Sequence, residues 1–131
     1  MAKTFEDLDV FNRAVSLMVA VYRATEDFPR REQYGLASQL RRASVSVLSD
    51  IAEGQGRLTP GEWRQMLSHA RGSLFEVEAQ LIAATKLGYL DEISMKQIRS
   101  KCKSVGKPLA GLIAYVQTKE ADKRQPAPGN R

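Results

Sequence analysis

The stretch SQLRRASVSVLSDIAEGQGR, residues 38–57, decides the fold of this chain. Its apolar residues recur every three or four positions, which is the period of one helix face. Together with Leu36, two positions before the stretch, these residues are Leu36, Leu40, Ala43, Val47 and Ile51. Val45, Leu48 and Ala52 widen this face, so we expect a helix that is buried over much of its circumference. Gly54 and Gly56 then predict its end, because glycine readily takes the left-handed conformation that stops helices.

Three further segments show the same period, and the sequence predicts helices at about 6–26, 30–53, 60–87 and 91–120. The second helix is expected to start at or just after Pro29, because proline is well tolerated at the first helical position. Thr59 and Glu62 have the spacing of a capping box at the start of the third helix. Pro108 falls inside the fourth, and because the apolar rhythm keeps its phase there we expect a kinked helix and not a loop.

These four amphipathic segments predict an all-α fold, an antiparallel up-down-up-down four-helix bundle that forms one domain over residues 1–120. Residues 121–131 contain no apolar side chain larger than alanine, so we expect a flexible tail. The second and third helices have more apolar surface than one bundle needs. Small residues also line a flank of the third, namely Gly72, Ala79 and Ala83. The surplus apolar surface predicts a homo-oligomer, and the small residues let a neighbouring backbone approach closely.

Charge is distributed unevenly along the 131 residues. Residues 1–56 contain seven Lys and Arg against eight Asp and Glu, whereas residues 57–131 contain thirteen against seven. The segment 96–119 has no acidic residue and six basic ones, which are Lys96, Arg99, Lys101, Lys103, Lys107 and Lys119. Such a stripe either attracts polyanions or is a solvated face that keeps the protein soluble.

Several classes of function find no support in the sequence. The single cysteine, Cys102, excludes an intrachain disulfide, and the polar N-terminus has no hydrophobic core of a signal peptide. No apolar run approaches the roughly 18 residues of a membrane span. His69 is the only histidine, and no serine has a base at catalytic spacing. We therefore expect a cytoplasmic protein with no membrane partner, no metal, no cofactor and no enzymatic activity.

Three basic residues outside the basic segment also suggest roles. Arg57 and Arg64 lie where they could hold an anion near the N-terminus of the third helix. Arg42 lies on the polar side of the second helix and either contacts nucleic acid or pairs with a carboxylate, Glu76 or Glu53. We favour a structural ion pair of Arg42 with Glu76.

Several short motifs resemble a known family, the four-helix-bundle proteins encoded within intervening sequences of bacterial 23S ribosomal RNA genes. The matching residues are Phe28-Pro29, Glu32, Tyr34-Gly35-Leu36, Gln39-Leu40-Arg41-Arg42-Ala43, Ser46, Ile51-Ala52-Glu53-Gly54, Gly56-Arg57, Ala70-Arg71-Gly72-Ser73-Leu74-Phe75-Glu76 and Leu87-Gly88-Tyr89-Leu90. Two positions depart from the pattern: Asp50 replaces the usual asparagine, and Pro108 is not typical of the family.

The resemblance implies a bundle that assembles into a ring-like oligomer, a pentamer, without known enzymatic activity. The family is distantly similar to the accessory protein of diversity-generating retroelements, a basic pentameric barrel that binds nucleic acid and a reverse transcriptase. Our leading hypothesis is a non-catalytic oligomer that binds RNA or DNA through Lys96, Arg99, Lys101, Lys103 and Lys107, with Arg57 and Arg64 secondary. The alternative is a scaffold that docks a protein partner and has no nucleic-acid role.

Overall fold

The structure, a computed structural model, describes residues 4–124. Within this range the chain forms four α-helices, α1 (Asp9–Thr25), α2 (Leu36–Gln55), α3 (Pro60–Lys86) and α4 (Glu92–Arg124), and two short 3-10 helices, η1 (Phe5–Asp7) and η2 (Arg30–Glu32). The described residues contain no strand. The predicted all-α class with four helices is therefore confirmed.

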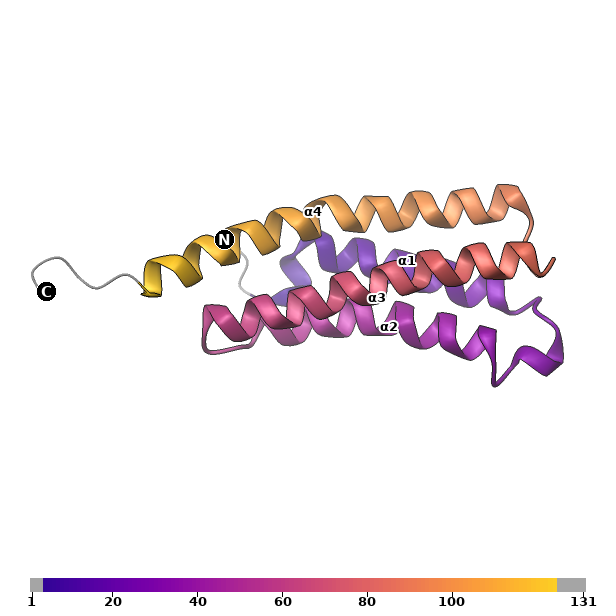
Figure 1. Cartoon of the computed structure of the whole chain (residues 1–131), viewed down its shortest axis with the longest axis horizontal. Coiled ribbons are helices and arrows are strands. Elements are labelled where there is room, and N and C mark those ends of the chain that lie inside the picture. The colour runs from indigo at the N-terminus through magenta and orange to yellow at the C-terminus, as the bar shows by residue number, and fades with distance from the viewer. Residues whose placement is uncertain (1–3, 125–131) are drawn as a thin grey trace, which may run out of the picture.

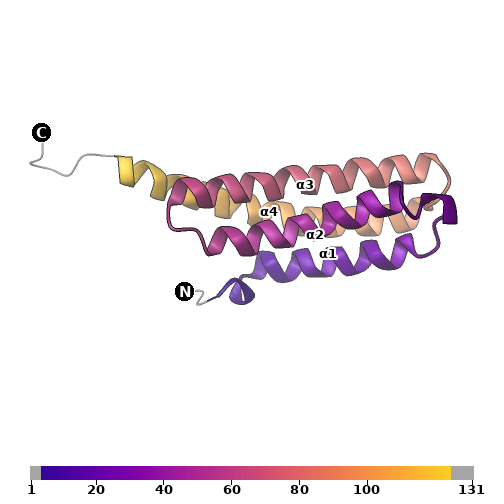
Figure 2. The same ribbon diagram turned by 90° about the horizontal axis from the view of Figure 1, so that it is seen from below.

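Each helix packs against two neighbours: α2 lies between α1 and α3, and α4 lies between α3 and α1. The α1–α2 and α3–α4 connections meet at one end of the bundle, and the α2–α3 connection lies at the other (Figure 1; Figure 2). The last turns of α4 extend beyond that second end. Among the described helices, none has an apolar stretch of the length that crossing a membrane requires.

The core consists of the apolar faces that the helical period predicted. One side chain from each helix illustrates the match, because Leu17, Leu40, Leu67 and Leu109 are all fully buried. The wider face of α2 is only partly covered, since Val45, Leu48 and Ala52 remain half-buried. This remaining surface of α2 is available to a neighbouring molecule.

The start of α2 differs from the prediction. Pro29 precedes the single 3-10 turn η2, and α2 begins only at Leu36. The Glu32 carboxylate accepts a hydrogen bond from the Leu36 amide at 3.1 Å, so it caps the helix at this later position. A Cβ at Gly35 would lie 2.5 Å from that carboxylate oxygen, so a larger residue here would displace the Glu32 side chain from its capping position.

A polar cluster joins the two connections at this end of the bundle. The Tyr89 hydroxyl donates a hydrogen bond to Glu32 at 2.9 Å, and the Phe28 and Tyr89 rings pack with centroids 5.6 Å apart. The Arg31 guanidinium lies 5.8 Å from the Tyr89 ring centre. Residues that carry the family resemblance at positions 28, 32 and 89 therefore hold the two connections together.

The helix α2 ends at Gly56 as predicted, but the two glycines act differently from the expected left-handed stop. Gly54 is a buried residue inside the helix, and a Cβ there would approach the Trp63 ring to 2.9 Å. Its role is close packing of α2 against α3. Gly56 caps the helix at φ −90°, ψ 0°, so it does not adopt the left-handed conformation. Among the described residues only Gly88, after α3, has a positive φ (80°).

The starts of α3 and α4 are capped by side chains. Thr59 caps α3 by accepting from the Glu62 amide at 3.2 Å, but the Glu62 carboxylate accepts from the Thr59 hydroxyl and not from its amide, so the predicted capping box is only half formed. Asp91 precedes α4 and accepts from the Ser94 amide at 2.7 Å, which lowers the Asp91 pKa.

The helix α4 continues to Arg124, so residues 121–124 of the predicted tail are helical. Residues 125–131 lie outside the described range.

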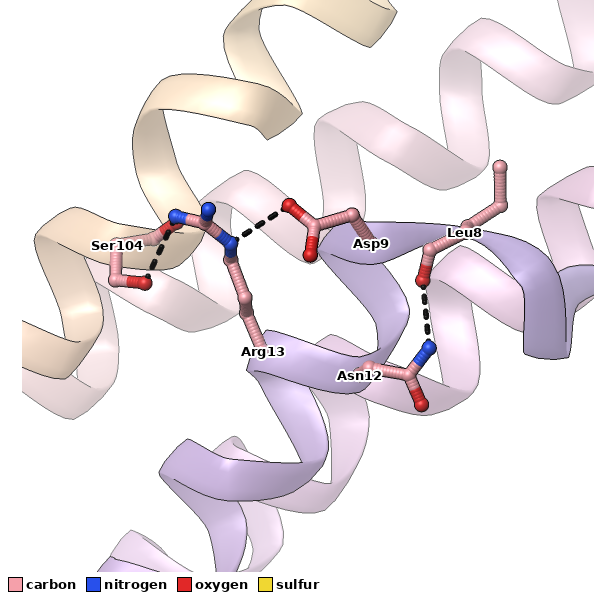
Figure 3. A network of polar contacts seen from close by, with 5 residues as sticks. All are labelled: Leu8, Asp9, Asn12, Arg13 and Ser104. Carbon is pink, nitrogen blue, oxygen red and sulfur yellow. Dashed lines mark hydrogen bonds and ion pairs between the residues drawn. The ribbon is translucent and has the colours of Figure 1, made fainter.

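The helix α4 runs through Pro108 without a break, as predicted. Proline has no amide hydrogen, so the Ser104 carbonyl loses its helical partner. The Arg13 guanidinium of α1 donates to this carbonyl and to the Ser104 hydroxyl, both at 3.1 Å, and the Asp9 carboxylate holds Arg13 at 2.7 Å (Figure 3). A side chain of α1 therefore replaces the missing hydrogen bond of α4.

Candidate nucleic-acid interface

The helix α4 places three of the predicted lysines on one side. Lys96, Lys103 and Lys107 lie within about 40° of one another around the axis, given about 100° per residue, and all three are exposed. Together with Arg99 and Ser100, two of these lysines line a shallow hollow of about 360 Å³. The geometry gathers positive charge without requiring any lysine to be buried.

Lys101 belongs to a different side of the helix. Its ammonium group donates to the Ser16 hydroxyl of α1 at 3.0 Å. Five residues after Lys96, it is turned by about 140° around the axis. Lys101 is therefore separated from the other basic residues, and the helical period alone could have shown this.

Arg99 is held by an acidic residue of the neighbouring helix. Its Nε atom lies 3.8 Å from a carboxylate oxygen of Glu78 in α3 and has no hydrogen-bond partner within the described structure. The ion pair neutralises part of the Arg99 charge. Arg99 therefore anchors α4 to α3 and contributes less positive charge than the free lysines.

A second hollow between α3 and α4 contains a basic residue that the sequence analysis did not select. Arg71 and Phe75 of α3 line it together with Lys103 and Lys107 of α4. The Arg71 guanidinium lies 5.6 Å from the Phe75 ring centre. Sequence offered no signal that these residues, about 30 positions apart, meet across two helices. We define the basic face as Arg71, Lys96, Arg99, Lys103 and Lys107.

The two secondary candidates, Arg57 and Arg64, do not join the basic face. Arg64 donates to Glu120 at 2.8 Å, near the last turns of α4, and is only partly exposed. Arg57 lies 3.5 Å from Glu53, in the preceding turn. Both guanidinium groups are paired with carboxylates, which weakens the case for an anion between them.

Arg42 and Glu76 line one polar groove of about 310 Å³ between α2 and α3. Both side chains are exposed, and no ion pair within 4.0 Å joins them among the described residues. Their structural ion pair remains a prediction. The groove also contains Gln80, whose side-chain oxygen is buried and has no hydrogen-bond partner in the described structure.

The wall of this groove includes a short hydrogen-bonded chain. The Ser73 hydroxyl donates to Ser46 at 3.1 Å, and Ser46 donates to Asp50 at 3.2 Å. Partial burial raises the Asp50 pKa, against the opposing effect of the Ser46 hydrogen bond. Asparagine at position 50 would accept the same bond without a charge.

Arg41, which the sequence analysis did not assign, stabilises the packing of α1 on α2. Its Nε atom donates to the Thr25 hydroxyl at 2.8 Å, and its guanidinium lies 5.0 Å from the Tyr22 ring centre. The motif residue Arg41 therefore has a structural role that a sequence pattern does not reveal.

Residues with catalytic or metal-binding chemistry are scattered. Burial raises the pKa of the Cys102 thiol to about 12, which keeps it protonated and unreactive at neutral pH. His69 is exposed on α3. Between residues 4 and 124 no group of three or more His, Cys, Asp or Glu side chains is placed to hold a metal ion.

The fold and this site define an all-helical protein of four packed helices with one basic face. The family model for 23S rRNA-intervening sequence proteins matches residues 6–111, and the chain belongs to this family. The resemblance recognised in the sequence motifs is thereby confirmed. Comparison with the curated proteins finds no match.

Proposed function

We propose that this protein is a non-catalytic, oligomeric accessory protein that binds RNA or DNA through the basic face. The observation that carries the proposal is the one-sided placement of exposed, unpaired positive charge. Of the five basic-face residues, only Arg99 has an ion pair within the described structure. Lysine and arginine side chains in this state gain affinity for polyanions by releasing counterions from the phosphates.

Contacts of this kind go to phosphates, so they supply affinity and little sequence preference. Lys96 and Lys107 are eleven residues apart on α4, about 16 Å along the helix. This length matches several phosphates of a nucleic-acid strand, which are spaced at roughly 3.4 Å per strand along a duplex. A cytoplasmic location is part of the proposal, because the partner is an intracellular polymer.

The experiment is fluorescence anisotropy with a labelled RNA and a labelled DNA from about 50 to 200 mM salt. We expect the logarithm of the affinity to fall linearly with the logarithm of the salt concentration. The double variant Lys103→Glu/Lys107→Glu should bind more weakly and lower the magnitude of the slope by about two, one for each lost contact.

The single variant Lys103→Glu has a matched control in Lys101→Glu, which makes the same charge change on the other side of α4. At physiological salt the screening length is about 8 Å, so we expect a small effect. Equal losses for the control and for Lys103→Glu would refute the basic face as the site. No binding of either nucleic acid at about 50 mM salt would refute the proposed function.

The antiparallel up-down-up-down order and assembly into a ring-like homo-oligomer, a pentamer by family resemblance, belong to the same proposal. The antiparallel order is supported by Arg64, in the second turn of α3, which contacts Glu120 near the end of α4. Self-association is supported by the flank of α3 that carries Gly72, Ala79 and Ala83, all of which are exposed.

A protein-binding scaffold is the second candidate. The half-buried surface of α2 and the small-residue flank of α3 are the features that favour it. In that case the lysines only keep the protein soluble. A charge-reversed basic face that leaves all nucleic-acid affinity unchanged would favour the scaffold.

A further inference from the structure

The hollow between α3 and α4 combines an apolar floor with a basic rim. It has a volume of about 310 Å³, and Leu74, Gly106 and Ala110 contribute to its apolar lining. A Cβ at Gly106 would lie 3.5 Å from Leu74, an ordinary contact distance, so packing does not require glycine at this position. The absent side chain keeps the floor of the hollow open.

Phe75 is the aromatic residue of this hollow, and 57% of its surface is exposed. The Arg71 guanidinium near the ring is itself exposed and has no carboxylate partner among the described residues. The guanidinium lies over the ring, and together with the exposed part of the ring it offers a stacking platform that carries positive charge.

The charge of the rim complements a phosphate chain. Lys103 and Lys107 border the hollow from α4, and Arg71 borders it from α3. Glu78 is the acidic residue of the lining, and Arg99 already pairs with it. The hollow therefore has an excess of positive charge around an apolar, aromatic surface.

We propose that this hollow binds single-stranded nucleic acid, with one unpaired base stacked on Phe75 and the flanking phosphates held by Arg71, Lys103 and Lys107. The inference rests on the proposed function and deepens it by naming the form of nucleic acid. In a duplex the bases are stacked inside and cannot reach an aromatic side chain, whereas the unstacked bases of a single strand can. A single strand should therefore bind more tightly than a duplex of equal charge.

The experiment compares a 20-nucleotide oligothymidine with a DNA hairpin of equal phosphate number, both at about 100 mM salt. Phe75→Leu keeps an apolar side chain of similar length and removes only the aromatic face. Stacking on one aromatic side chain is lost in this variant, and we expect single-strand affinity to fall about tenfold with hairpin affinity within about twofold of the wild type. Tyr34→Leu is the matched control, because Tyr34 is 90% exposed and does not line this hollow.

A second readout detects stacking directly. An oligothymidine with one 2-aminopurine should lose fluorescence on binding to the wild type and lose less on binding to Phe75→Leu. Unchanged single-strand affinity in Phe75→Leu, together with weaker binding by Lys103→Glu/Lys107→Glu, would overturn base stacking and leave the proposed function intact. A changed oligomer mass in Phe75→Leu would assign Phe75 to contacts between copies and would also overturn it. Failure of the wild type to bind either DNA would reject both.

Discussion

At the scale of single residues, two carboxylates have pKa values that move in opposite directions. The Glu32 pKa is lowered, first by the hydrogen bond from the Leu36 amide and then by the bond from the Tyr89 hydroxyl. The Asp50 pKa is raised by burial. The first carboxylate therefore stabilises the fold in its charged form, and the second opposes folding when it is charged.

Glu32→Gln should lower the melting temperature at pH 7. The two carboxylate oxygens accept hydrogen bonds from the Leu36 amide and the Tyr89 hydroxyl, whereas a glutamine side chain has only one oxygen that can accept. The stabilisation by charged Glu32 is present above its ordinary pKa of 4.5 and is lost as the pH falls through the lowered folded value. The difference between variant and wild type should therefore shrink in acid. Thermal unfolding from pH 7 to pH 3 measures it, with exposed Glu26→Gln as the control. A difference that stays constant over this range would contradict the prediction.

Asp50→Asn should raise the melting temperature at pH 7. The amide still accepts the Ser46 hydrogen bond and carries no charge that burial would penalise. Because the folded Asp50 pKa is raised, protonation stabilises the wild type as the pH falls toward 3.8, and the advantage of the variant should disappear below that pH. A lower melting temperature of the variant at pH 7 would show that the charged hydrogen bond outweighs the cost of burial.

At the scale of helices, Arg13 completes the hydrogen bonding that Pro108 interrupts. The Ser104 carbonyl receives its donor from α1, so the two helices are coupled at this point. Such coupling favours one register of α1 against α4. The Ser104 carbonyl, which Pro108 leaves without a donor in its own helix, therefore has a tertiary partner. Without Arg13 this carbonyl would be left to water.

A double-mutant cycle tests this coupling. Arg13→Ala should lower the free energy of unfolding by about 1–2 kcal/mol in the wild-type background, because a carbonyl loses its charged donor. In the Pro108→Ala background the restored amide can bond the Ser104 carbonyl, so the same change should cost about 1 kcal/mol less. Urea unfolding of the four proteins gives the coupling free energy. Additive effects of the two substitutions would contradict a shared carbonyl.

At the scale of the whole molecule, the outward flank of α3 has a sequence that the single chain does not explain. A Cβ at Gly72 would meet nothing within 4 Å, yet glycine in an exposed helix interior costs about 1 kcal/mol relative to alanine. Ala79 and Ala83 extend the same flank. Close approach by a second copy would explain why these side chains are small.

Ala79→Arg should therefore reduce the molar mass measured by light scattering at micromolar concentration, since a long charged side chain would block the approach. Ala114→Arg is the matched control, because Ala114 is an exposed alanine on α4. A monomeric wild type at this concentration would refute the oligomer. An unchanged oligomer in Ala79→Arg would move the contact to another surface.

The sequence by itself determined the number of helices, their buried faces and the family. The period of 3.6 residues is local, so the burial of Leu17, Leu40, Leu67 and Leu109 follows from spacing along the chain. The same period places Lys96, Lys103 and Lys107 on one side of α4 and separates Lys101 from them.

Only the tertiary structure decided where α2 begins, how Pro108 is accommodated and which residues of α3 join the lysines. Glu32 and Tyr89 are 57 positions apart, Arg13 and Ser104 are 91 apart, and their hydrogen bonds exist only after the helices pack. Arg71 and Phe75 likewise reach Lys103 across a helix boundary. A local pattern cannot specify which distant side chains become neighbours, because that depends on the packing of all four helices together.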